Sequence, residues 1–254
     1  MIISLRARLL LLLVFVCVSS SAQQLFKDSH CEAPDHNLWS DLLTEHVDSL
    51  GWVSYQGFVA DSARLNEYLT ALSLCPPNSN WTDNETLAYW INVYNAFTVK
   101  LIVDHYPITS IKEIKKGIPF VNSVWDIKFF EIGGRKMDLN EVEHSILRKQ
   151  FKEPRIHFAI VCASVSCPRL LNQAYQPEML YTQLKLQTKN FIDDYQKNEI
   201  GADQIRISPI FKWFAGDFTQ NGSIQEFIKP YSSRDLKKTA KVRYLEYDWS
   251  LNGE

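Results

Sequence analysis

Residues 84–102 read NETLAYWINVYNAFTVKLI and predict the central helix of the fold. Their apolar side chains recur at three- and four-residue steps, which is the period of an α-helix, and the pattern continues as far as Pro107. Asp83 or Asn84 can cap the first turn. Because apolar residues occupy an unusually wide face of this helix, we expect it to be buried.

Two amides lie on this helix. Asn92 and Asn95 are three residues apart and therefore point in nearly the same direction. A buried amide must find hydrogen-bond partners, or it destabilises the fold by roughly 1–3 kcal/mol. The pair can tie down a neighbouring loop, or it can act in a site by orienting an imidazole or by donating to an oxyanion. Both interpretations are kept.

The rest of the chain alternates between helical and extended patterns. Amphipathic spacing predicts further helices over 36–50, 60–74, 177–195 and 224–228, and a capping box from Asp138 to Glu141 opens another. Predicted strands are 156–162, 205–207 and 242–249, and residues 118–134 predict a hairpin or a loop leading to strands. We therefore expect one α+β domain over residues 23–254, with helices packed on a small, mainly antiparallel sheet.

The first 22 residues have the pattern of a secretory signal peptide. Arg6 and Arg8 precede an apolar run over residues 9–18, and small residues end the segment at Ala22. The apolar run is about ten residues long, too short for a helix that spans a bilayer. We expect an exported protein, periplasmic or secreted, with no stable membrane insertion once the signal is removed.

The charge balance narrows the class of partner. The chain has a formal net charge of −2, and its short basic clusters are interrupted by acidic residues. This composition gives no indication of nucleic-acid binding. No cysteine or histidine spacing typical of a metal site occurs, and no cofactor is indicated. The expected partner is a small molecule or a peptide.

Four cysteines remain after the signal, in a compartment where disulfides persist. Cys31 and Cys75 are the expected structural pair. Cys162 and Cys167 form either a redox pair or one functional thiol beside a spectator.

The strongest concentration of reactive side chains is RIHFAIVCASVSCP, residues 155–168. The strand predicted over 156–162 places His157 and Cys162 on opposite faces, so they do not form a simple pair. Cys167 directly precedes Pro168, as at the start of a helical turn, where backbone N–H groups favour a thiolate. This slightly favours Cys167 as nucleophile over Cys162, and a purely structural role for both thiols is the alternative.

Two more residues are candidates for the site. His144 lies one helical turn from Glu141 and from Arg148, either as a paired surface imidazole or as a buried one held by a carboxylate. Asp217 lies in an aromatic turn over 208–218 and can cap a helix, orient a histidine or bind nothing.

Four segments together resemble the domain-of-unknown-function family 547. They are residues 89–97, 142–148, 155–168 and 208–218, and the resemblance covers roughly residues 36–230. It implies that Asn92, Asn95, His144, His157, Cys162, Cys167 and Asp217 lie within family motifs, and it implies no activity. A weaker similarity, to the papain and transglutaminase-like architecture, places Asn92 and Asn95 where such folds have their cysteine.

These patterns predict an exported, thiol-dependent hydrolase or acyltransferase that acts on an amide or a thioester. Cys167 or Cys162 would be the nucleophile and His157 the base, and Asn92 or Asn95 would orient the base or bind the oxyanion. The alternatives are a thiol-redox protein that uses Cys162 and Cys167, and a non-catalytic binding module.

Overall fold

The long helix α4, Asp83–Val103, is the element around which the N-terminal half packs. The computed structural model describes residues 31–115 and 123–254, so the predicted signal peptide and residues 118–122 of the expected hairpin lie outside the described residues. Fifteen residues of α4 are buried, as its wide apolar face predicted. The cap is Thr82, however, because its hydroxyl and the Glu85 side chain form a reciprocal capping box one residue before the predicted position.

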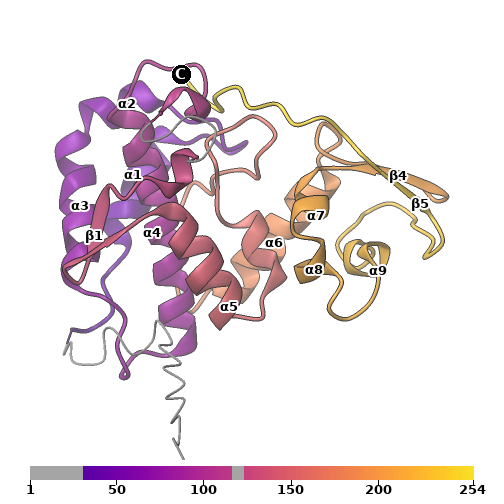
Figure 1. Cartoon of the computed structure of the whole chain (residues 1–254), viewed down its shortest axis with the longest axis horizontal. Helices are drawn as coiled ribbons and strands as arrows, with labels where there is room; N and C mark the ends of the chain where they lie inside the picture. The colour runs from indigo at the N-terminus through magenta and orange to yellow at the C-terminus, as the bar shows by residue number, and fades with distance from the viewer. Residues whose placement is uncertain (1–30, 116–122) are drawn as a thin grey trace, which may run out of the picture.

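Three shorter helices lie against α4 or beside its neighbours: α1 (Asn37–His46), α2 (Tyr55–Ala60) and α3 (Ser62–Leu74) (Figure 1). Trp39 of α1 stacks on Tyr68 of α3 with ring centroids 5.6 Å apart. The predictions for α1 and α3 are confirmed, and α3 ends just before the two prolines that cannot continue a helix.

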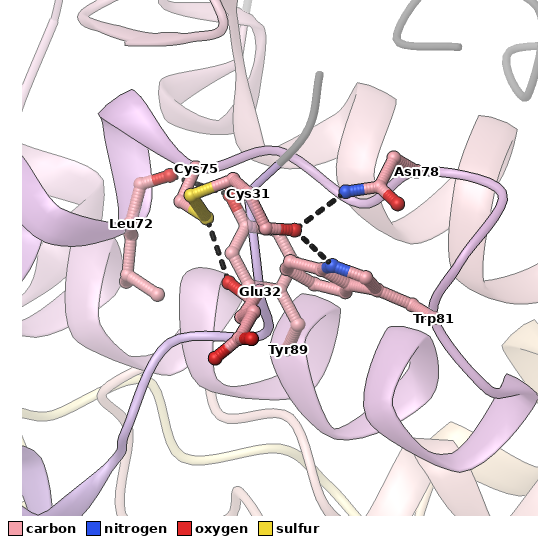
Figure 2. The surroundings of a disulfide bond; sticks show 7 residues. All are labelled: Cys31, Glu32, Leu72, Cys75, Asn78, Trp81 and Tyr89. Carbon is pink, nitrogen blue, oxygen red and sulfur yellow. Dashed lines mark hydrogen bonds between the residues drawn. A yellow bond between two sulfur atoms is a disulfide. The ribbon is translucent and has the colours of Figure 1, made fainter. Parts of the chain in front are cut away.

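A disulfide joins Cys31 to Cys75, so the predicted structural pair is confirmed. Figure 2 shows that the carbonyl of Cys31 also accepts hydrogen bonds from the Asn78 amide, at 2.7 Å, and from the Trp81 indole, at 2.8 Å. The segment before α1 is thereby fastened to the end of α3 and to the turn that leads into α4.

The chain after α4 contains two short 3₁₀ helices, η2 (Ile111–Glu113) and η3 (Val124–Asp126), and then an antiparallel hairpin of β1 (Phe130–Ile132) and β2 (Arg135–Met137). Asp138 then caps the next helix, since its Oδ1 accepts the N–H of Glu141 at 2.8 Å. This helix winds as a π-helix, η4 (Glu141–Leu147), before α5 (Arg148–Gln150). Such wider turns are frequent at functional sites.

The C-terminal half builds a second apolar core, rich in phenylalanine. Its helices are η5 (Pro154–Phe158), α6 (Leu180–Asp193), α7 (Ile210–Trp213), α8 (Ala215–Phe218) and α9 (Ile224–Ile228). Its strands are β3 (Glu199–Ile200), β4 (Gln204–Ile207) and β5 (Lys241–Tyr244), with β3 antiparallel and β5 parallel to β4. After β5 the chain runs back across the molecule to α2, where Gly253 bridges to Val53 (Figure 1).

The strand predicted over 156–162 is wrong. Residues 154–158 form the 3₁₀ helix η5, and the following residues are irregular. The segment is continuously buried because it lies between the two apolar cores, with Ile156 in the first and Phe158 in the second. A buried irregular segment and a buried strand have the same apolar sequence pattern.

The α+β class is confirmed. The strand pairs of the described residues are mainly antiparallel, but they belong to two separate small sheets rather than one, and the N-terminal helices pack on α4 rather than on a sheet. The papain-like architecture and the single domain stay predictions. Within residues 31–115 and 123–254, none of the helices combines the length and the apolarity needed to cross a bilayer.

Candidate active site

A cavity of about 200 Å³ lies between η4, η5, α7 and the C-terminal segment. Four of the seven predicted site residues line it: His144, His157, Cys162 and Cys167. Asp217 does not line this cavity but binds His157 from behind, and the two asparagines are not among the lining residues. The structure thus brings five of the predicted residues to one place.

Asn95 positions the chain that carries the reactive residues. Its amide nitrogen donates to the carbonyl of Ala159 at 2.9 Å, and its oxygen accepts the N–H of Val161 at 3.0 Å. The held residues lie between His157 and Cys162, so this buried amide sets their relative position without touching either side chain. Asn95 therefore fits the loop-fastening interpretation.

Asn92 fastens a second loop in the same way. It donates to the carbonyl of Tyr175 at 2.8 Å and accepts the N–H of the same residue at 3.0 Å. Neither asparagine bonds an imidazole, and neither lines the cavity. The two asparagines lie three residues apart on α4 because each satisfies the buried backbone groups of a different loop.

Cys162 is a free, partly exposed thiol in the cavity wall. Its sulfur lies 3.1 Å from the hydroxyl of Ser164 and 3.1 Å from that of Tyr247. Burial raises the pKa of this thiol, but hydrogen bonds from Cys167, Ser164 and Tyr247 outweigh burial and lower the pKa to about 7. Cys162 is therefore substantially ionised at neutral pH.

Cys167 has the opposite character, which corrects the preference for it as nucleophile. It is only 3 % exposed, and its sulfur accepts the backbone N–H of Cys162 at 2.8 Å. Burial, together with the neighbouring Cys162, raises the pKa of this thiol well above its ordinary value. The helical turn expected after Pro168 is absent, since the chain there is irregular, so no helix terminus favours a thiolate.

The loop that holds both thiols is fixed by the C-terminal segment. Ala163 has a positive φ of 55°, a conformation that costs free energy for a residue with a side chain. Ser164 forms a bridge with Leu251, and Val165 donates to the carbonyl of Ser250 at 2.8 Å. These contacts, distant in sequence, hold the loop in the strained conformation that presents Cys162 to the cavity.

His157 is held at one ring nitrogen by Asp217. The side chain is buried, its Nε2 lies 2.7 Å from Asp217 Oδ2, and its ring stacks on Phe214 with centroids 4.0 Å apart. Hydrogen bonds from His157, and further ones from Arg148, hold the pKa of Asp217 well below its usual range. Because that carboxylate is ionised, Nε2 carries the proton and Nδ1 is the free, basic nitrogen.

Glu143 faces this free nitrogen. Its Oε1 lies 3.9 Å from His157 Nδ1, and its Oε2 accepts the hydroxyl of Tyr94 at 3.3 Å. Burial raises the pKa of Glu143 to about 7, although the charge of Arg148 acts in the other direction. A carboxyl group with this pKa can both donate and accept a proton at neutral pH.

His144 lies beside this group, half-buried in the cavity wall. Its Nδ1 accepts a hydrogen bond from Arg148 Nη1 at 3.0 Å, so the ring pairs with the guanidinium rather than with Glu141. Burial and the charge of Arg148 lower the pKa of His144, which keeps the ring neutral at neutral pH. Of the two predicted alternatives, the contact resembles the paired imidazole, with Arg148 as the partner, although the ring is half-buried rather than at the surface.

Sequence reasoning missed Glu143, Arg148 and Tyr247. A signal for Glu143 existed, because it lies three and four residues before the buried Ile146 and Leu147 and so shares their helix face. An acidic residue on an apolar helix face is costly to bury and therefore indicates a specific role. Tyr247 gave no signal, since its contact with Cys162 spans 85 residues.

The described residues contain one group with metal-ligand geometry, formed by Glu45, His46 and Asp61. Arg64 forms ion pairs with both of these carboxylates, at 2.7 Å and 3.3 Å, and His46 binds Asp61 at 2.7 Å. The acidic charge is thereby already paired within the chain, and we assign no metal to it.

The comparisons with known proteins concern part of the chain. The model of the family described as "Protein of unknown function, DUF547" matches residues 78–192. No curated protein and no solved structure gives a significant match. The matched segment includes three of the four predicted motifs, with His144, His157 and both thiols, and it ends before Asp217. Residues 78–192 are therefore similar to the DUF547 family, which supports the resemblance that the motifs predicted.

Proposed function

We propose that the protein is a thiol-dependent hydrolase or acyltransferase acting on an amide or a thioester, with Cys162 as the nucleophile. One observation carries the proposal: a free thiol whose pKa is lowered to about 7 shares a cavity with the His157 and Glu143 side chains. Thiol nucleophiles need partial ionisation and a nearby proton carrier, and both are present.

The reaction proceeds in two displacements. The Cys162 thiolate attacks the carbonyl carbon, a carbon–sulfur bond forms, and the bond to the leaving amine or thiol breaks while the leaving group takes up a proton. Water, or an acceptor nucleophile, then attacks the thioester, releases the acyl group and returns the thiolate.

His157 and Glu143 serve as the proton carriers. Neither thiol is hydrogen-bonded to His157 in the structure, and Cys162 needs no base for its ionisation near pH 7. The imidazole therefore acts on the leaving group and on the attacking water through Nδ1, and Glu143 exchanges protons with that nitrogen. Asp217 and Arg148 are positioning residues, since Asp217 holds His157 in one tautomer and Arg148 holds Asp217.

Acyl transfer from an activated ester tests the proposal. We expect p-nitrophenyl acetate to acetylate one residue, which intact mass spectrometry and peptide mapping identify as Cys162. The Cys167→Ser variant should still be acetylated, because serine keeps a hydrogen-bonding group beside Cys162, whereas Cys162→Ser should not. Equal labelling of wild type and Cys162→Ser, or no acetylation of native protein at pH 8, would overturn the proposal.

A thiol-redox function is the second candidate, and the proximity of the two thiols favours it. The Cys162 N–H donates to the Cys167 sulfur at 2.8 Å, and the two thiols are also hydrogen-bonded to each other, so they lie close together. Oxidation by a small disulfide such as oxidised glutathione would form the bond between the two sulfurs and pass two electrons and two protons to that disulfide, which becomes two thiols. A reduction potential below about −300 mV would indicate a merely structural bond and exclude this function.

Export is part of the proposal. The signal-like segment over residues 1–22 and the disulfide between Cys31 and Cys75 support it, because disulfides persist in oxidising compartments. Expression of the full chain with fractionation checks it: we expect the N-terminal residues to be removed and the product to leave the cytosol.

A further inference from the structure

Four large aromatic rings form one side of the cavity and are here called the aromatic wall: Trp125, Trp213, Tyr247 and Trp249. Tyr247 lies 4.5 Å from Trp249 and 4.9 Å from Trp213 between ring centroids, and Trp213 stacks on Trp249 at 5.9 Å. The wall adjoins the reactive thiol, because the Tyr247 hydroxyl lies 3.1 Å from the Cys162 sulfur.

Part of the aromatic wall lies outside the two cores. Trp125 and Tyr247 pack against the cores, whereas Trp213 is 48 % exposed, and neither Trp213 nor Trp249 belongs to either core. Rings held open to solvent beside a reactive group are typical of ligand contact, since aromatic side chains give large contact areas at small entropic cost.

The charges of the cavity are negative or neutral. Among the residues that line it, Glu143 and the thiols can become anions, and none is a lysine or an arginine. Burial lowers the pKa of both His144 and His157, so neither supplies a positive charge at neutral pH. The cations nearest to the lining are Arg148, which is paired with Asp217, and Lys112, which lies on the Trp249 ring, so the lining itself offers an anionic substrate group no counter-ion.

Aromatic faces attract cations, and this wall already does so. The ammonium of Lys112 lies 3.7 Å from the ring centroid of Trp249. The attraction arises from the negative face of the aromatic ring and increases where water is excluded.

We propose that the cavity receives a cationic group of the substrate, an ammonium or a guanidinium, against the aromatic wall, with Glu143 as its counter-ion. The inference deepens the proposed function, because it names the class of amide or thioester that reaches Cys162. It restricts the substrate to molecules with a positive charge near the scissile bond.

The surroundings of Glu143 couple this binding to pH. Tyr94 of α4, His157 of η5 and Arg148 of α5 face the carboxyl group, and the charges of Cys162 and Asp217 act on it from farther away. Its pKa is about 7 in the free protein. A cation stabilises the ionised carboxylate, so its affinity should increase by about tenfold between pH 6 and pH 8.

Three probes of nearly equal shape test the charge. Choline carries the cation, 3,3-dimethylbutanol is its neutral counterpart, and 3,3-dimethylbutyrate is an anion. With the reduced full-length protein at pH 8, calorimetry or ligand-observed NMR should show choline binding at least tenfold more tightly than the alcohol, and no binding of the anion. Equal affinity for choline and the alcohol would overturn the inference.

A matched pair of variants locates the site. Trp213→Leu should weaken choline binding at least tenfold, while Trp52→Leu should leave it unchanged, because Trp52 is similarly exposed at 46 % but lines a different cavity. Equal effects of the two substitutions would contradict the location. If choline fails to bind while p-nitrophenyl acetate still acetylates Cys162, only this inference fails and the proposed function stands.

Discussion

His157 Nε2 lies 2.7 Å from Asp217 Oδ2, across 60 residues of sequence, and Arg148 binds the same carboxylate at 2.6 Å. The carboxylate can therefore accept from the imidazole without becoming protonated, because the hydrogen bonds from His157 and from the guanidinium of Arg148 hold its pKa well below its usual range. This arrangement fixes one tautomer of the imidazole and leaves Nδ1 for proton transfer.

Replacement of Asp217 tests that relationship. Asp217→Asn can donate its own proton to Nε2 and so favours the other tautomer, in which Nδ1 no longer accepts a proton. We expect hydrolysis of the acetyl thioester on Cys162 to slow by about 100-fold, while its formation changes little. The decay of acetylated protein in a time series of mass spectra measures the first rate, and the release of p-nitrophenolate measures the second. A variant that slowed both steps equally would assign Asp217 to folding of the site.

The Tyr247 hydroxyl should contribute to the acidity of Cys162. Tyr247→Phe removes one of the hydrogen bonds that lower the pKa of the thiol. If the pKa rises by about one unit, the thiolate fraction at pH 7 falls about fivefold. The ultraviolet absorbance of the thiolate across a pH titration measures the change directly. Tyr244→Phe, which alters an exposed ring at the end of β5, is the matched control and should leave the pKa of Cys162 unchanged.

Glu143 should reduce the stability of the fold in a pH-dependent way. The pKa of this carboxyl is about 7 in the folded protein and about 4.5 in the unfolded chain, so between these values the unfolded chain releases a proton that the folded protein keeps. The unfolding free energy therefore decreases as pH rises from about 4.5 to about 7. Glu143→Gln should increase it by about 3 kcal/mol at pH 8 and by about 1 kcal/mol at pH 5.

Denaturant titrations at the two pH values check this prediction. A gain that was the same at both would mean that the charge of Glu143 is not the cause. If Glu143→Gln stabilises the fold and also slows thioester hydrolysis, Glu143 serves function at the expense of stability, as functional groups often do.

The two asparagines of α4 provide a comparison between stability and reactivity. Asn92→Ala and Asn95→Ala each leave one buried carbonyl and one buried N–H without a partner, and each should cost about 3 kcal/mol. Only Asn95 holds the chain between His157 and Cys162, so only Asn95→Ala should also slow acetylation of Cys162. Equal acetylation rates in the two folded variants would contradict the positioning role of Asn95.

The disulfide between Cys31 and Cys75 should account for a separate part of the stability. It closes a sequence separation of 44 residues, for which loss of unfolded-state entropy predicts up to about 4 kcal/mol. Thermal unfolding of the double variant Cys31→Ser and Cys75→Ser measures this, and Cys162 should keep its reactivity. Loss of that reactivity in the folded variant would mean that the disulfide also shapes the site.

Local patterns in the sequence predicted much of the fold. Helices α1, α3, α4 and α6 follow from amphipathic periodicity, and the proline pair after α3 marks its end. The segment after η5 could not be assigned correctly, because its burial comes from two cores that meet around it and from the amide of Asn95. Apolar composition records burial and not backbone conformation.

Only part of the candidate site could be predicted from the sequence. His157, Cys162 and Cys167 are close in sequence and could be found together. The sequence slightly favoured Cys167. It does not show the hydrogen bonds from Cys167, Ser164 and the distant Tyr247 that lower the pKa of Cys162, nor the burial that raises the pKa of Cys167. Glu143 was within reach of sequence reasoning, as a carboxyl group on a buried helix face.

The most direct test of the central claim is the pH dependence of alkylation by iodoacetamide in the native protein, with the disulfide between Cys31 and Cys75 intact. We predict that Cys162 alone is labelled, with a half-maximal rate near pH 7, and that Cys167 stays unlabelled until the protein unfolds. Labelling of Cys167 in the native state, or a midpoint for Cys162 near pH 9, would contradict the account.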